Sequence, residues 1–345
     1  MHSQWQQFLE TQSATIENGV LACFTEPKQE LQGCDQQAIM TDLSFYGIIK
    51  ISGDDAQTFL QGQFSNDVKL VTPELAQISS YNSPKGRAFA TFILFQTGED
   101  YFVQLPREIL EPTLKRLSMF VMRSAVKLED ISDQLVCLGL SGDSVEAIID
   151  LPSKEAYTCK TDHGKTIIRV PGQQSRFIVL TDVKSAITLW NDLNVSVKPV
   201  GSACWQRLNI LAGIPEVLSN TRESFVPQML NLQIVGGISF TKGCYPGQEV
   251  VARMHYLGKL KKRMYLASLQ QDSAPQAGDK IILKDSEQSV GEVVNAIQNG
   301  QKGYDLLLVL QIANEEDKLF LQGKAEQALQ LKSLPYKIEQ LTKNN

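Results

Sequence analysis

Residues 242–249 read Lys242-Gly243-Cys244-Tyr245-Pro246-Gly247-Gln248-Glu249, and Val250-Val251-Ala252-Arg253 follows them. A cysteine stands here between two glycines, close to a lysine, a proline and a carboxylate. Two interpretations are open for this octapeptide. It is either a structural joint with an inert cysteine, or a loop that presents a working thiol. The rest of the sequence has to discriminate between them.

The composition indicates a soluble globular protein. The chain has 345 residues, of which 43% are hydrophobic and 21% charged, enough for two or three domains. The net charge of -5 does not favour a nucleic-acid-binding protein. No segment approaches the roughly 18 apolar residues of a membrane span, and the polar N-terminus lacks the pattern of a secretory signal. We therefore expect a cytoplasmic protein with no membrane partner.

The cysteines and histidines exclude several kinds of site. The six cysteines, at positions 23, 34, 137, 159, 204 and 244, form no C-x-x-C motif, and only three histidines occur. This scatter is neither a disulfide framework nor a metal site. Five of the cysteines are interpreted as small buried apolar residues, and Cys244 is treated separately because of its neighbours.

The first part of the chain predicts a ferredoxin-like α/β layer. Strand-like and helix-like patterns alternate after a loosely patterned leader of about 35 residues, in which 4–12 is a helical candidate. The order resembles a split βαβ unit. The predicted strands are 46–52, 77–81, 87–95, 100–104 and 126–130, and the predicted helices begin near Ala56 and cover 107–120.

The remainder predicts a second α/β layer and a C-terminal antiparallel β-barrel. The second layer has strands 135–140, 166–170 and 176–181 with helices 144–150 and 184–194, and helix 202–212 follows. Short strands between turn clusters then occur at 263–269, 280–285, 289–296 and 304–312. We predict an α+β protein of three domains: 36–132 together with 203–258, then 133–202, then 259–345.

Short landmarks occur in order along residues 40–336. They are Gly53–Ala56, Asn66–Val68, Pro84–Arg87, Ala212–Pro215, Phe225–Gln228, Gly236–Phe240, the stretch KGCYPGQEVVAR and Leu334–Tyr336. Together they resemble the YgfZ-type branch of the aminomethyltransferase (GcvT)-like folate-binding proteins. The octapeptide carries most of this resemblance, because the other landmarks are short.

The resemblance implies a fold and a function. It implies three domains in a ring around a central hole, a tetrahydrofolate site, and a role in the assembly or repair of iron–sulfur clusters. In bacteria that role is expressed through tRNA modification by tRNA-thiolating enzymes that depend on such clusters, and a mitochondrial assembly factor belongs to the same group. Iron–sulfur enzymes or cluster carriers are the implied partners, and a transient iron–sulfur cluster is the second implied cofactor.

The octapeptide itself has the features of a reactive thiol. Pro246 suits the first position of a helix, which would place Cys244 just outside a helix N-terminus, where the dipole favours the thiolate. Lys242 would add positive charge. Glu249 and Arg253 either frame this catalytic site or pair with each other at i, i+4. Whether the thiol ligates a cluster, accepts sulfur or attacks a partner stays open.

A pterin ring stacks on aromatic side chains and is hydrogen-bonded along one edge. The landmarks match Tyr46 and Trp205 to the two aromatic positions that this branch associates with folate, although Trp205 equally suits core packing. Asn66, Arg87 and Gln248 are the polar candidates for the same site. For Asn66 and Arg87 the alternative is a role in a turn or a cap.

The sequence departs from the family pattern at two places. Relatives often carry an acid immediately before the Ala212-Gly213 pair, where this chain has Leu211. Aminomethyltransferases use an aspartate on the strand that here reads Phe89-Ala90-Thr91-Phe92, without a carboxylate. One-carbon transfer is therefore not expected, and we predict a protein that is not a conventional enzyme. A tetrahydrofolate-dependent aminomethyl transferase or demethylase is the competing hypothesis.

Direct tRNA binding is not expected either. The run Lys259-Leu260-Lys261-Lys262-Arg263 is interpreted as a solvated face. The chain as a whole is acidic, and no aromatic residue interrupts this run.

Overall fold

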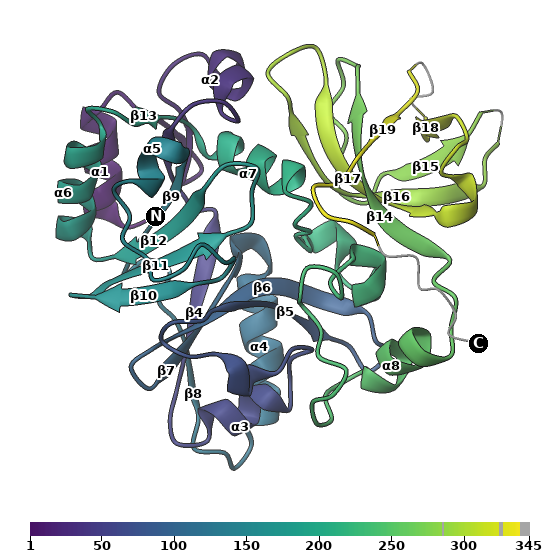
Figure 1. Cartoon of the computed structure of the whole chain (residues 1–345), viewed down its shortest axis with the longest axis horizontal. Coiled ribbons are helices and arrows are strands. Elements are labelled where there is room, and N and C mark those ends of the chain that lie inside the picture. The colour runs from purple at the N-terminus through teal and green to yellow at the C-terminus, as the bar shows by residue number, and fades with distance from the viewer. Residues whose placement is uncertain (285, 324–326, 339–345) are drawn as a thin grey trace.

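The computed structural model of the chain describes residues 1–284, 286–323 and 327–338. Within these residues, the β-structure consists of three large sheets, of five, six and six strands, and a two-stranded ribbon. Helix α7 (Ser202–Leu211) lies between the second and third sheets (Figure 1) and contacts both of them. Among the described residues, no helix has both the length and the apolar character that crossing a bilayer requires.

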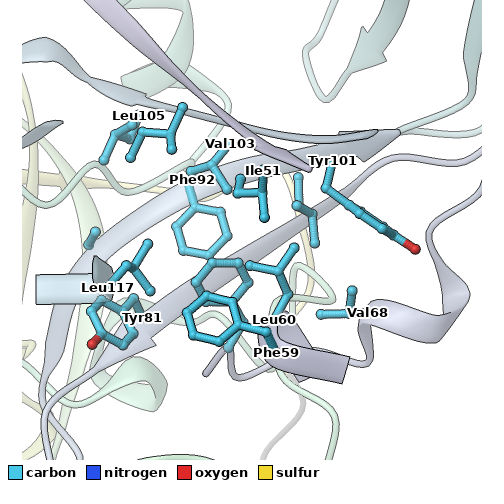
Figure 2. Close-up of a cluster of buried hydrophobic side chains, with 14 of the residues drawn as sticks. Ile51, Phe59, Leu60, Val68, Tyr81, Phe92, Tyr101, Val103, Leu105 and Leu117 are labelled. Carbon is cyan, nitrogen blue, oxygen red and sulfur yellow. The ribbon is translucent and has the colours of Figure 1, made fainter. Parts of the chain in front are cut away.

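The first sheet has the strand order β5-β6-β7-β4-β8 and is antiparallel throughout. The predicted ferredoxin-like α/β layer is present, with one difference. Three strands lie between its two helices in the chain, whereas a split βαβ unit has two. Figure 2 shows Phe59 and Leu60 of one helix packed against strand residues such as Phe92. Its elements are β4 (Tyr46–Ser52), α3 (Ala56–Gln61), η1 (Val68–Leu70), β5 (Gln77–Asn82), β6 (Ala88–Thr97), β7 (Asp100–Pro106), η2 (Arg107–Ile109), α4 (Leu110–Val121) and β8 (Lys127–Asp130).

The second sheet has the order β10-β11-β12-β9-β3-β13, in which only β13 and β3 pair in parallel. Helices α1 and α6 contribute buried side chains to its core. Its elements are α1 (Ser3–Thr11), β3 (Ile39–Asp42), β9 (Val136–Ser141), α5 (Asp143–Glu146), β10 (Cys159–Asp162), β11 (Lys165–Val170), β12 (Arg176–Thr181), α6 (Val183–Leu193) and β13 (Lys198–Pro199).

The N-terminal residues are not a loose leader, which corrects the sequence prediction, whereas the helix predicted within them at 4–12 is confirmed by α1. They form α1, the ribbon of β1 (Thr15–Glu17) and β2 (Val20–Cys23), and α2 (Pro27–Gly33). Trp5 is fully buried: its ring meets that of Trp190 edge-on at 5.5 Å, and its Nε1 donates to Asp42 at 2.9 Å. The apolar residues of α1 are too few to give a strong sequence pattern, yet they complete the second core.

The third sheet, order β18-β15-β16-β17-β14-β19, is antiparallel and curls into the predicted barrel-like shape (Figure 1). Its strands are β14 (Lys262–Leu269), β15 (Lys280–Leu283), β16 (Ser289–Gln298), β17 (Tyr304–Gln311), β18 (Leu319–Leu321) and β19 (Gln330–Lys332). The last two were not predicted because three residues show no alternation. Asp285, at the end of one predicted strand, and the C-terminal residues 339–345 lie outside the described part of the chain.

Helix α7 connects the three sheets. It contacts β2 and β3 on one side and β16 and β17 on the other, and its Asn209 is hydrogen-bonded to Tyr46 of the first sheet. The proposed domain boundaries stay a prediction. Strand β3, which they assign to the first unit, is paired in the second sheet with β9.

Candidate functional site

A narrow cavity of about 50 Å³ lies where the first two sheets meet α7 and the loop that follows it. Apolar side chains form most of its wall, and a few polar groups converge on it. This combination is typical of a small-molecule site. Its lining includes Tyr46, Thr91, Arg176, Trp205, Asn209 and Glu216.

Three polar side chains from separate elements meet in this cavity. The Tyr46 hydroxyl donates to the Glu216 carboxylate, and Asn209 Nδ2 donates both to Tyr46 Oη at 2.7 Å and to Glu216 Oε1 at 3.1 Å. Burial is the main cause that raises the pKa of Glu216, and burial likewise raises the pKa of Tyr46 well above its usual range. The cavity thus contains a buried carboxyl group whose ionised form would be stabilised by a ligand of complementary charge.

A buried guanidinium stands beside this carboxyl group. Arg176 is 1% exposed, and its Cζ lies 4.1 Å from the centroid of the Trp205 ring. One Nη donates to the Pro171 carbonyl at 3.0 Å and the other donates to Asn209 Oδ1. Burial lowers the pKa of Arg176 to about 10. Its Nε is buried and has no hydrogen-bond partner in the described part of the chain.

Trp205 satisfies both interpretations of its helical position. It lines the cavity, and at 1% exposure it is also part of the core between the first two sheets. Because Arg176 covers part of the ring, Trp205 supports the guanidinium and does not offer a free stacking surface. Together, Glu216 and Arg176 can pair with a flat polar ring that has donors and acceptors on its edge.

The two departures from the family pattern have different consequences. Leu211 does not line this cavity, and it faces a smaller neighbouring cavity instead. Glu216 supplies the carboxyl group. Sequence reasoning missed it, although it follows the Ala212–Pro215 landmark directly. Thr91 lies on the strand stretch 89–92, which has no carboxylate in this chain. Its hydroxyl donates to the Pro215 carbonyl and accepts from Val217 N, both at 3.0 Å.

The octapeptide forms a separate place on the molecule. Cys244 is exposed, whereas Cys23 is partly buried and the remaining four cysteines are buried, as predicted for those four. Residues 242–249 are all described, and none of them lines the cavity. The structure thus divides the predicted site residues into two groups, Tyr46 and Trp205 at the cavity and Cys244 with its neighbours at an outer loop.

Lys242 anchors this loop. Its side chain is 7% exposed, and Nζ donates to the carbonyls of Gln61 at 2.8 Å, Phe64 at 2.6 Å and Asn66 at 2.9 Å. Burial lowers the pKa of Lys242 to about 8, with Asp67 opposing the shift. With its donors committed to three carbonyls, Lys242 holds the loop against the segment after α3, which differs from the predicted role beside the thiol.

Gly247 fixes the turn after Cys244. Its φ of +79 lies in the left-handed region, and an added Cβ would stand 2.5 Å from the Ser83 carbonyl oxygen and the Gly86 Cα. The octapeptide therefore packs backbone against backbone on the turn between β5 and β6. Helix α8 (Gln248–Tyr256) begins only after Gly247. This corrects the prediction that Pro246 is its first residue, because a left-handed residue interrupts the helical geometry.

Three predicted folate contacts are engaged in local structure. Asn66 Nδ2 donates to the carbonyls of Gly236 at 2.7 Å and Ile78 at 3.0 Å. Arg87 is exposed and donates to the Ser224 carbonyl. Gln248 Nε2 donates to the Lys242 carbonyl at 3.3 Å, which closes the loop. None of the three lines the cavity.

Glu249 and Arg253 lie on exposed turns of α8. No ion pair joins them, or engages either with another residue that the structure describes, so the interpretation as a simple i, i+4 pair has no support in the structure. Both side chains remain available around the thiol loop.

Comparisons with known proteins identify the family. Residues 6–162 match the family described as the GCVT N-terminal domain. A "tRNA-modifying protein YgfZ" of Colwellia psychrerythraea is 31% identical over 317 residues, covering 87% of this chain and 94% of that protein. The chain belongs to the YgfZ family. An Escherichia coli O157:H7 YgfZ is 30% identical over 321 residues, covering 91% of this chain and 98% of the relative.

The fold agrees with this assignment. The glycine cleavage system aminomethyltransferase T of Bartonella henselae superposes with a TM-score of 0.71 and covers 95% of this chain and 96% of its own, at 17% sequence identity. YgfZ proteins and this aminomethyltransferase thus share one fold, as the landmarks predicted, and an identity this low shows the fold alone.

Proposed function

We propose that this protein is a folate-binding factor that supports the assembly or repair of iron–sulfur clusters and, through cluster-dependent enzymes, tRNA modification by thiolation. The observation that carries the proposal is the cavity with Glu216, Arg176 and Asn209. The similarity of the whole chain to proteins named tRNA-modifying protein YgfZ supplies the link to tRNA. We place this activity in the cytoplasm.

Tetrahydrofolate fits the donor set of the cavity. Its pterin edge presents amino and ring N–H donors, which suit the Glu216 carboxylate, and its carbonyl oxygen suits a guanidinium. The unpartnered Nε of Arg176 is a buried donor that a ligand would satisfy. When bound, the cofactor would supply one-carbon chemistry at its reduced ring. The protein would hold the ring through Glu216, Asn209 and Arg176 and exclude water through the apolar wall.

Cys244 is the proposed reactive thiol. Its loop is held firmly at both sides, by Lys242 before it and by Gly247 after it, while the cysteine itself stays exposed. A fixed backbone with an accessible sulfur suits a thiol that meets a partner protein, such as an iron–sulfur enzyme or a cluster carrier. The proposal leaves open whether the sulfur ligates a cluster, accepts sulfur or attacks a partner.

An aminomethyl transferase or demethylase is the alternative function, since the fold is that of an aminomethyltransferase. Thr91 argues against it. This strand position provides a hydroxyl that is already engaged with two backbone groups, and it provides no carboxylate to accept a proton.

The test is a calorimetric titration of the full chain with tetrahydrofolate, followed by incubation with aminomethyl donors and mass spectrometry. We expect saturable binding of one tetrahydrofolate per chain and no catalytic formation of methylenetetrahydrofolate. Absence of binding would contradict the folate proposal. Multiple turnovers to methylenetetrahydrofolate would establish the alternative function instead.

A further inference from the structure

The segment that begins on α8 is the most basic part of an acidic chain. Residues 250–271 contain five Lys and Arg residues and no Asp or Glu. Of the 33 Lys and Arg residues in the chain, the other 28 stand against 38 Asp and Glu residues, a balance of -10. Positive charge is thus concentrated along the chain at the end of α8 and the linker into β14, whereas the rest of the chain has a net negative charge.

Three of the five cations of this segment, Arg253, Lys259 and Lys261, are exposed and form no ion pair with a described residue. Two acidic groups belong to the surroundings of this segment: Glu249, on the first turn of α8 itself, and Glu315, which accepts from the Tyr265 hydroxyl at 2.6 Å. Both ends of the basic segment therefore have an acidic group nearby in the chain or across from it, although neither group forms an ion pair with Arg253, Lys259 or Lys261.

Aromatic rings cluster within this segment: His255 and Tyr256 lie between Arg253 and Lys259 in the chain, and Phe240 from outside the segment packs on both of them. The ring of Phe240 stacks on His255, with centroids 3.7 Å apart and planes 12° apart. Tyr256 meets the His255 ring edge-on at 4.7 Å and remains 64% exposed. Two features of the sequence argue against direct tRNA contact, the acidity of the chain and the lack of aromatic residues within 259–263. The exposed ring of Tyr256, three residues before that run, weakens the second of these grounds.

We propose that Tyr256, Arg253, Lys259 and Lys261 form a docking surface for RNA, in which the cations contact phosphates and an unpaired base stacks on Tyr256. This combination is the usual one for single-stranded RNA. The proposal rests on the proposed function for the choice of tRNA as the RNA. Helix α8 has nine residues and is about 13 Å long, so the docked strand lies within one helix length of the Cys244 loop.

An acidic protein is the competing partner for this surface, because its carboxylates would also pair with the cations. The exposed face of Tyr256 favours RNA, since a base can stack on it.

The test is filter binding of unmodified tRNA to the full chain across a series of salt concentrations. We expect a salt slope of about -2 for three phosphate contacts on a single strand. The triple variant Arg253→Ala, Lys259→Ala, Lys261→Ala should lose most of this slope. Tyr256→Ala should weaken binding by about tenfold at every salt concentration.

The matched control replaces three exposed cations elsewhere, Lys69→Ala, Lys115→Ala and Arg123→Ala, with the same change in net charge. It should bind tRNA as the unmodified protein does. No tRNA binding by the unmodified protein, equal losses in both triple variants, or an unchanged affinity in Tyr256→Ala would each overturn the proposal. The second and third outcomes would indicate bulk charge or an acidic protein as the occupant.

Tetrahydrofolate titration of the docking-surface variants keeps the two proposals apart. None of the substituted residues lines the cavity, so the variants should bind tetrahydrofolate with the affinity of the unmodified protein. A protein that binds tRNA but no folate would contradict the proposed function and leave the docking surface standing.

Discussion

Replacing Glu216 by glutamine is expected to raise the Kd for tetrahydrofolate by about 50-fold. The carboxylate is the cavity group that can accept two N–H donors from a pterin edge, and charge-assisted hydrogen bonds contribute about 1.5–3 kcal/mol each. Glutamine keeps the volume and one acceptor but places an NH₂ group where a donor has to be received. Isothermal titration calorimetry measures the change.

The control for this variant is Glu111→Gln, which removes the same charge from an exposed position on α4 away from the cavity. It should bind tetrahydrofolate like the unmodified protein. Thermal unfolding of Glu216→Gln should stay close to that of the parent, because a buried carboxyl group is replaced by a neutral one of equal size. Equal affinity in Glu216→Gln and the parent would refute the role given to this side chain.

Replacing Gly247 by alanine is expected to lower the free energy of unfolding by about 3 kcal/mol. An L-residue held at a left-handed φ costs about 1–2 kcal/mol, and the new Cβ would stand 2.5 Å from backbone atoms of Ser83 and Gly86. Backbone atoms cannot move aside as a side-chain tip can, so the loop must separate from the β5–β6 turn. Urea unfolding measures the loss.

Gly243→Ala is the matched control, four residues earlier in the same loop. Its φ is not in the left-handed region, and an added Cβ there would have no atom within 4 Å. Its free energy of unfolding should remain within about 0.5 kcal/mol of the parent value. If the two alanine variants are equally stable, the backbone contact between Gly247 and the Ser83–Gly86 turn does not hold the loop.

The regular elements of this protein are predictable from its sequence because their patterns are local. The strand over 46–52, the helix with Ala56, Phe59 and Leu60, and the strands β14 to β17 of the third sheet follow from apolar periodicity and turn residues. The exposed Cys244 among buried cysteines also follows from its glycine and proline neighbours. The short β3 and β13 could not be predicted, because they gain stability from pairing with distant segments.

The side-chain geometry of the site is less predictable, since it depends on contacts between distant segments. The sequence predicts that Lys242 assists the thiol, whereas in the structure its ammonium donates to carbonyls near residue 64, about 180 positions away. Glu216 has no local signal beyond the landmark before it, and its role becomes visible only when Tyr46 and Asn209 are brought beside it. The aromatic neighbours of the basic segment likewise include Phe240, which lies outside that segment in the sequence.

The most direct test of the account is complementation of a strain that lacks this protein with the Cys244→Ala variant, scoring thiolated tRNA bases by mass spectrometry. Cys244 is exposed, so its replacement should leave the fold intact, and Cys23→Ala serves as the control. The account predicts that Cys244→Ala leaves thiolation at the level of the deficient strain while Cys23→Ala restores it. Full restoration by Cys244→Ala would contradict the claim that this thiol performs the function of the protein.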